Sequence, residues 1–175
     1  AFGDPDDTRF LDLKLDRELL ASHRWASNNS IFATIGMNYA DAARRSAVNG
    51  EPGYLWLENA RAYGRMGDPP DWLDREAMGS NPCVEQTLWD RELCCLVETY
   101  PAHHDSLEDY LRTLRVAFLY AKSVTLVPTH DADTDAVMAR NRRVGCSMTG
   151  IVQAIDRFGY REFMNWCDRG YRYIR

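Results

Sequence analysis

Short runs of β-branched and aromatic residues alternate along this chain with longer segments of helical periodicity. The segment 94–99 (CCLVET) is typical of a buried strand. In 107–126, apolar residues recur at positions 107, 111, 114, 118 and 121, which is the spacing of one face of a long amphipathic helix. Because strands that alternate with helices favour parallel pairing, we predict an α/β fold in which most strands are parallel.

The same patterns predict the rest of the secondary structure. Two more strands are expected at 29–35 and 144–148, and further helices at 6–14, 39–48, 54–63, 133–142, 150–156 and 160–171. Asp105 or Ser106 would cap the helix that begins at 107. Gly and Pro recur between 65 and 82, so this region is predicted to be a loop or a chain of turns.

Length and composition exclude several classes of protein. A chain of 175 residues has room for one domain with a core. The net charge of −5 argues against nucleic acid as a partner, and no apolar stretch approaches the ~20 residues that span a bilayer. The chain begins with neither an initiator Met nor a signal sequence, so we expect it to have been trimmed, processed or excised.

Five cysteines, an odd number without a secretory signal, indicate a reducing compartment. Cys83 follows a Pro in the irregular region, and Glu85 is two residues further on. Cys94 comes eleven residues after Cys83, so a hairpin-like excursion would bring both sulfurs into one cavity. Spacing alone leaves three possibilities open: a catalytic thiol at Cys83, a zinc site, or small buried apolar residues, the interpretation we give to Cys146 and Cys167. The zinc site would draw on Cys83, Cys94, Cys95, His103 or His104.

The segment around Cys83 resembles the active-site loop of ribonucleotide reductases, in which N-P-C-x-E is followed by E-x-C-N-L. Here these patterns are Asn81-Pro82-Cys83-Val84-Glu85 and Glu92-Leu93-Cys94-Cys95-Leu96. The chain departs from the family at Val84, where Gly is common, and at Cys95, where Asn is usual. Further stretches resemble the monomeric adenosylcobalamin-dependent members, in order along almost the whole chain: 3–7, 24–30, 50–53, 56–61, 121–126, 128–130 and 141–145.

The resemblance implies a role for each residue of the loop. Cys83 would hold the thiyl radical that removes hydrogen from the ribose 3′ carbon, and Glu85 would take the 3′ hydroxyl proton. Asn81, with Pro82, would contact the substrate and orient the sugar hydroxyls. Cys94 would be one of two reducing thiols that become a disulfide, its partner lying outside this chain. No metal ligand is expected in the chain.

The resemblance also implies a larger assembly. The family fold is a ten-stranded α/β barrel with the active cysteine on an internal finger loop, and residues 1–175 would be its central segment, incomplete at both ends. The cofactor would be adenosylcobalamin, and the substrate a ribonucleoside triphosphate. The expected partners are the remaining segments or subunits of the reductase and a thioredoxin-like reductant, with neither nucleic acid nor membrane. The expected location is the cytoplasm of a bacterium, or of a bacterial host if the protein is viral.

Two alternative functions remain open at this point. One is a diphosphate reductase that receives its radical from a separate metal-containing subunit. The other is a non-catalytic fragment that acts as a structural or interaction partner. The eleven-residue interval from Cys83 to Cys94 and the Arg142-Arg143-Val144-Gly145 segment favour the adenosylcobalamin-dependent type.

Overall fold

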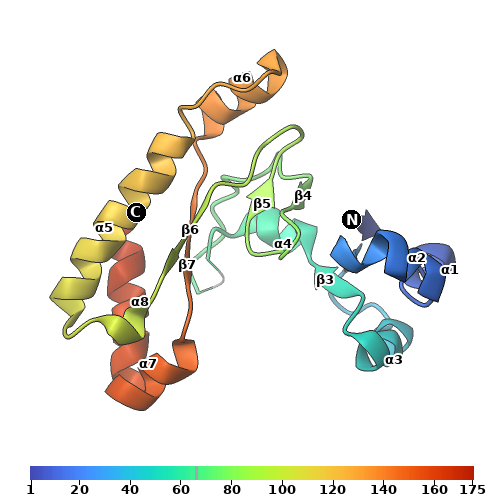
Figure 1. The fold of residues 1–175 in the computed structure, drawn as a ribbon, viewed down its shortest axis with the longest axis horizontal. Helices are drawn as coiled ribbons and strands as arrows, with labels where there is room; N and C mark the ends of the chain where they lie inside the picture. The colour runs from blue at the N-terminus through green and yellow to red at the C-terminus, as the bar shows by residue number, and fades with distance from the viewer. Residues whose placement is uncertain (66) are drawn as a thin grey trace. The chain divides into compact units, whose positions relative to one another are not determined.

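A computed structural model describes residues 1–65 and 67–175 of the chain (Figure 1). Where the length indicated room for one domain, the described residues form two compact units, Ala1–Asp90 and Arg91–Arg175. Each unit contains its own strands, helices and buried residues. No described helix has both the length and the apolar composition to cross a membrane.

The first unit begins with a three-stranded parallel sheet in the order β1-β2-β3. Its strands are β1 (Phe2–Gly3), β2 (Ser30–Phe32) and β3 (Gly53–Leu55). Parallel strands need crossover connections, and here these are helical (Figure 1). The segments between β1 and β2 are α1 (Thr8–Leu11), α2 (Arg17–Ser22) and a 3₁₀ turn, η1 (Arg24–Ala26). Helix α3 (Ala40–Asn49) connects β2 to β3.

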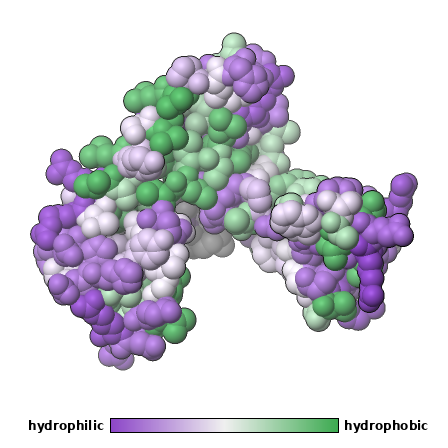
Figure 2. Space-filling view, viewed as in Figure 1, coloured by the Kyte–Doolittle hydropathy of each residue, from purple (hydrophilic) through white to green (hydrophobic). Residues whose placement is uncertain are grey.

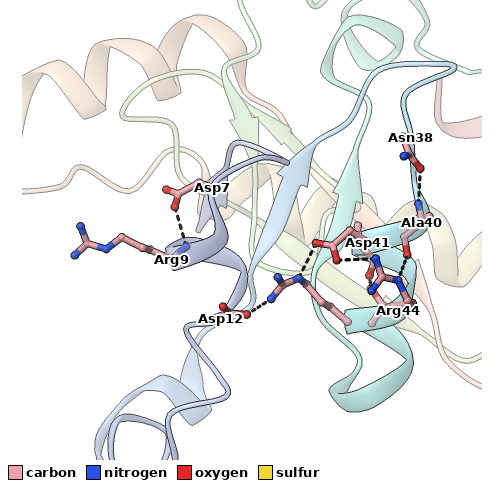
Figure 3. Close-up of polar contacts among 10 residues, drawn as sticks. Asp7, Arg9, Asp12, Asn38, Ala40, Asp41 and Arg44 are labelled. Carbon is pink, nitrogen blue, oxygen red and sulfur yellow. Dashed lines mark hydrogen bonds and ion pairs between the residues drawn. The ribbon is translucent and has the colours of Figure 1, made fainter.

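The core of this sheet forms around Ile31, which has no exposed surface. Leu11 and Ala42 are buried against it, from α1 and α3 respectively. Polar contacts fix the same helices (Figure 3). Asp7 caps α1 by accepting a hydrogen bond from Arg9 N at 3.0 Å, and Arg45 of α3 pairs with both Asp12 and Asp41.

The first unit ends in an antiparallel hairpin. Its strands are β4 (Gly79–Ser80) and β5 (Thr87–Leu88), with Gly79 opposite Leu88 and Ser80 opposite Thr87. Helix α4 (Leu57–Ala62) lies before the hairpin in the sequence. Arg61 of α4 donates from Nε to Ala77 O at 2.8 Å. The base of the hairpin is therefore tied to a helix.

The second unit contains a two-stranded parallel sheet and most of the helical residues. The strands are β6 (Leu96–Thr99) and β7 (Gly145–Met148). A 3₁₀ turn, η2 (Pro101–His103), and the helices α5 (Leu107–Val124) and α6 (Ala132–Asn141) connect them. Helices α7 (Ile151–Phe158) and α8 (Tyr160–Ile174) follow β7. Ser106 caps α5 by accepting from Asp109 N at 3.2 Å, as predicted.

The core of the second unit lies where α5 and α8 pack together. Trp166 stacks on Tyr110 with ring centroids 5.8 Å apart, and on Phe158 with centroids 4.4 Å apart. Leu107 and Leu114 complete the buried cluster. The other side of α5 and the residues that follow it expose a run of apolar side chains, and hydrophobic surface gathers over this region in Figure 2. These exposed residues are Val116, Leu119, Tyr120, Val124, Leu126 and Val127.

The α/β class and the prevalence of parallel strands are confirmed by the pairing of both parallel sheets. The helix predicted over 54–63 is wrong at its start, because Tyr54 and Leu55 pair with β2 and the helix begins at Leu57. The strand predicted over 94–99 begins only at Leu96, and it is not fully buried, since Leu96 is 40% exposed. The predicted loop 65–82, of which residue 66 lies outside the described residues, contains strand β4, which the sequence pattern missed.

Replacing Trp166 with Ala tests the core of the second unit. The change removes both ring contacts and leaves a cavity, so we expect a loss of about 3–5 kcal/mol in the unfolding free energy of this unit. Tyr160→Ala is the matched control on the same helix, because Tyr160 is exposed and its removal should cost less than about 0.5 kcal/mol. Hydrogen exchange in peptides from α5 and α8 measures both values. Unchanged protection in Trp166→Ala would contradict this account of the core.

Candidate active site

The loop of the hairpin is closed by the side chain of Asn81. This residue is only 3% exposed. Its backbone N donates to Gln86 O at 2.9 Å, and its side-chain Oδ1 accepts from Gln86 N at 3.1 Å. Its Nδ2 donates to Glu85 Oε1 at 2.5 Å. One amide therefore joins the two ends of the loop and also holds the Glu85 carboxylate.

Between these ends the chain makes a tight turn. Val84 N donates to Asn81 O at 3.0 Å, which places Pro82 and Cys83 at the two central positions of a β-turn. Pro suits the first of these positions because its φ is already fixed near −65°. Val84 then adopts a φ of 68°, in the left-handed region that favours Gly and that strains a β-branched residue.

Asn28 supports the turn from outside the hairpin. Its Nδ2 donates to Pro82 O at 3.1 Å, across 54 residues of sequence. No role for Asn28 was expected from the sequence, although this residue lies in the stretch 24–30 that resembles the reductases. Asn residues are common beside predicted strands, so the sequence alone could not identify this contact.

Four of the five predicted site residues, Pro82 included, thus share one loop. Cys83 and Glu85 are exposed near its tip, whereas Asn81 is buried at its base. Asn81 and Glu85 are in direct contact. Such an arrangement presents a thiol and an oriented carboxylate to a bound molecule, and loops held by a rigid scaffold commonly carry reactive groups.

A cavity of about 420 Å³ lies beside this loop within the first unit. Val84 forms part of its wall, next to Cys83 in the sequence. Tyr54 and Trp56, stacked with centroids 5.6 Å apart, form an aromatic part of the lining. The remaining lining residues are Leu55, Asn59, Ala60, Tyr63, Gly64 and Arg65. The volume and the aromatic lining are typical of a small-molecule site.

Cys94 lies beyond the hairpin, in the second unit, just before β6. The hairpin closes at Leu88, so Cys94 is not on one of its arms. Cys94 is exposed and its neighbour Cys95 is buried, as expected of adjacent residues that point to opposite sides of an extended chain. Burial raises the pKa of the Cys95 thiol, and the negative charge of Glu92 raises it further.

Cys146 and Cys167 line a second cavity, in the second unit, together with Tyr110 and Trp166. Both thiols are half-buried, and desolvation raises the pKa of each. His104, one of the candidate zinc ligands, is buried, and its ring nitrogens lie 3.0 Å from Tyr100 O and 2.8 Å from Thr113 Oγ1. Within 1–65 and 67–175, no three His, Cys, Asp or Glu residues gather as a metal site.

No family model matches the chain. Among curated proteins, it is 51% identical over 173 residues to an adenosylcobalamin-dependent ribonucleoside-triphosphate reductase from Euglena gracilis. A reductase of the same name from Lactobacillus delbrueckii is 37% identical over 154 residues. These alignments cover 98% and 86% of this chain but 24% and 21% of the relatives. The chain therefore spans about a quarter of their length.

A solved structure agrees with these relatives. The crystal structure of a B12-dependent (class II) ribonucleotide reductase superposes with a TM-score of 0.76 and 35% sequence identity, over 91% of this chain and 23% of that one. Sequence and fold agree, because over nearly its whole length the chain is similar to one segment of the class II ribonucleotide reductases. Within this class it is a homologue of the adenosylcobalamin-dependent ribonucleoside-triphosphate reductases, which confirms the resemblance. The Euglena relative gives no support to the expected bacterial origin.

The environments of the thiols predict their relative reactivity. The thiolate is the form that reacts with iodoacetamide, so exposed Cys83 and Cys94 should be labelled first. Because the pKa of Cys95 is raised, its labelling should require both a higher pH and local opening. Peptide mass spectrometry across pH 7–9 measures each rate. Equal labelling of Cys94 and Cys95 at pH 7 would show that the two side chains do not differ in burial.

Proposed function

We propose that this chain is a catalytic segment of an adenosylcobalamin-dependent ribonucleoside-triphosphate reductase, and that it takes part in reducing ribonucleotides to 2′-deoxyribonucleotides. The observation that supports this proposal most strongly is the loop in which buried Asn81 contacts Glu85, two residues after exposed Cys83 in the sequence. The named relatives, 51% and 37% identical over most of this chain, support the assignment. Because those relatives are named as triphosphate reductases, the diphosphate alternative is not favoured.

Each group of the loop has a chemical task in this proposal. Cys83, as a thiyl radical, takes the hydrogen atom from C3′ of the ribose and becomes a thiol again. Glu85 removes the proton of the 3′ hydroxyl, a step that needs hydrogen-bond reach. The 2.5 Å contact from Asn81 engages Oε1 of Glu85, and we assign Oε2 to the proton. Because the turn that carries Cys83 and the carboxylate of Glu85 are both held in place before the substrate binds, the loop needs little reorganisation during the reaction.

The reduction itself uses two thiols. Cys94 is one, and a cysteine outside residues 1–175 is the other. Together they supply two electrons and two hydrogens, the 2′ hydroxyl leaves as water, and the two sulfurs form a disulfide. The hydrogen atom on Cys83 then returns to C3′, which regenerates the thiyl radical. A thioredoxin-like dithiol would reduce the disulfide for the next turnover.

The cavity beside Val84 fits part of the proposed cofactor. Adenosylcobalamin, when bound, would supply the initial radical. A volume of about 420 Å³ lined by Tyr54 and Trp56 suits a planar group the size of an adenosine, and it is too small for a whole corrin ring. Residues outside this chain would therefore hold the corrin.

The remaining segments of the reductase are the proposed partners. The two parallel sheets leave outer strand edges, and parallel sheets are normally covered on both faces within larger folds. The exposed apolar run on and after α5 also favours a protein partner. We propose that further strands complete a ten-stranded barrel around the Cys83 loop as its finger, and that the assembly works in the cytoplasm without nucleic acid.

Cys83→Ala tests the radical assignment in the complete reductase. The variant lacks the only group assigned to C3′ hydrogen abstraction, so turnover should fall to background while cobalamin and nucleotide binding persist. Cys167→Ala is the matched control, because that thiol is half-buried in the second unit and has no assigned role. Product is measured by chromatography of deoxynucleotides, and binding by equilibrium dialysis. Turnover in Cys83→Ala would overturn the proposed function.

Glu85→Gln tests the proton transfer separately. The amide is nearly isosteric and can still contact Asn81, but it cannot accept the 3′ hydroxyl proton. We expect kcat to fall by about 10²–10⁴-fold with KM changed much less. Steady-state kinetics with a dithiol reductant measures both parameters. A wild-type kcat would mean that another group is the base.

A further inference from the structure

We infer that the buried ion pair between Glu92 and Arg143 positions Cys94, so that both residues are positioning residues for the reducing thiol. This inference rests on the proposed function. Glu92 Oε1 accepts from Arg143 Nε at 3.2 Å. The Glu92 side chain has no exposed surface, and that of Arg143 is 22% exposed. Neither residue was assigned a role from the sequence.

Burial sets this pair apart from the surface ion pairs of the second unit. Arg112 and Asp109, for example, are both exposed, with Nη2 and Oδ1 2.8 Å apart. Such surface pairs contribute little to stability. A fully buried carboxylate must keep its cationic partner, since an unpaired buried charge is very costly. Arg143 therefore fixes the position of Glu92, which lies two residues before Cys94.

The pair lies beside the parallel ladder. Glu92 precedes β6 and Arg143 precedes β7, and these strands pair with Leu96 opposite Gly145. The ladder continues one step toward Cys94, because Gly145 N donates to Cys95 O at 3.0 Å. On the other side of Cys94, Leu93 N lies 3.2 Å from Met138 Sδ of α6. The backbone is thus held on both sides of Cys94 while its side chain stays exposed.

This arrangement suits a thiol that reacts with a substrate and then forms a disulfide with another sulfur. Disulfide formation needs two Cα atoms about 4.4–6.8 Å apart, with the side chains directed at each other. A displacement of about 1 Å in a reacting group can cost about 100-fold in rate. An ion pair has a preferred geometry, whereas apolar packing is non-directional, so we assign the position of the backbone before Cys94 to this pair. Glu92 and Arg143 would therefore affect the reductive step without contacting the substrate.

Arg143→Met in the complete reductase is the test, with Arg112→Met as control. We expect turnover to fall about 100-fold, with the KM for nucleotide changed less than about twofold. The radical step depends on Cys83, so the rate of cob(II)alamin formation should stay near wild type. Arg143→Lys, which keeps the charge, should recover part of the turnover. Arg112→Met should be unchanged in every measurement.

A second variant separates positioning from folding. Glu92→Leu combined with Arg143→Met removes both charges, and such replacements are often neutral or stabilising for the fold. We expect this double variant to form cob(II)alamin normally and to remain slow in turnover. Wild-type turnover in either variant, or an equal loss of radical formation and turnover, would overturn the inference. Failure of the proposed function is distinguishable, because the unmodified reductase would then make no deoxynucleotide.

Discussion

Parallel strand pairing is the constraint on which both units depend. Strands joined by crossovers start at the same edge of a sheet, so residues that precede them are brought together across long stretches of sequence. In the first unit, Asn29 precedes β2 and Glu51 precedes β3, and Asn29 Nδ2 donates to Glu51 Oε2 at 3.0 Å. In the second, Glu92 and Arg143 meet in the same way. Each sheet therefore gathers polar residues at its amino edge.

In each unit, this edge also supports a part of the chain to which we assign chemistry. Asn28, next to Asn29, contacts Pro82 in the Cys83 loop, and Glu92 lies two residues before Cys94. Open α/β sheets generally bind ligands at the carboxyl ends of their strands. Here the groups with assigned chemistry lie near residues that precede β2 and β6. A loop anchored in this way keeps its reactive side chains exposed while its backbone stays fixed.

Periodicity predicted α5 and α8 well, because their apolar spacing is sustained, and side-chain caps at Ser106 and Asp131 mark the starts of α5 and α6. It failed at β3 and β4, because strands of three and two residues are defined by their pairing partners rather than by a pattern of their own. For the site, the motif predicted roles for Asn81, Cys83, Glu85 and Cys94, which stay predictions, and the structure brings the first three into one loop. The motif could not identify Asn28 or Arg143, because their contacts span 54 and 51 residues and depend on the fold. The placement of Cys83 relative to Cys94 stays a prediction.

The two departures from the family pattern are compatible with the proposed chemistry. Val84 occupies a left-handed conformation in which Gly would be unstrained, and its side chain lines the cavity rather than closing the loop. The closing contacts come from Asn81, which does not depend on residue 84 having no side chain. Cys95 adds a thiol beside Cys94, but it is buried with a raised pKa. Because disulfide exchange proceeds through an accessible thiolate, burial keeps this extra thiol from competing with Cys94.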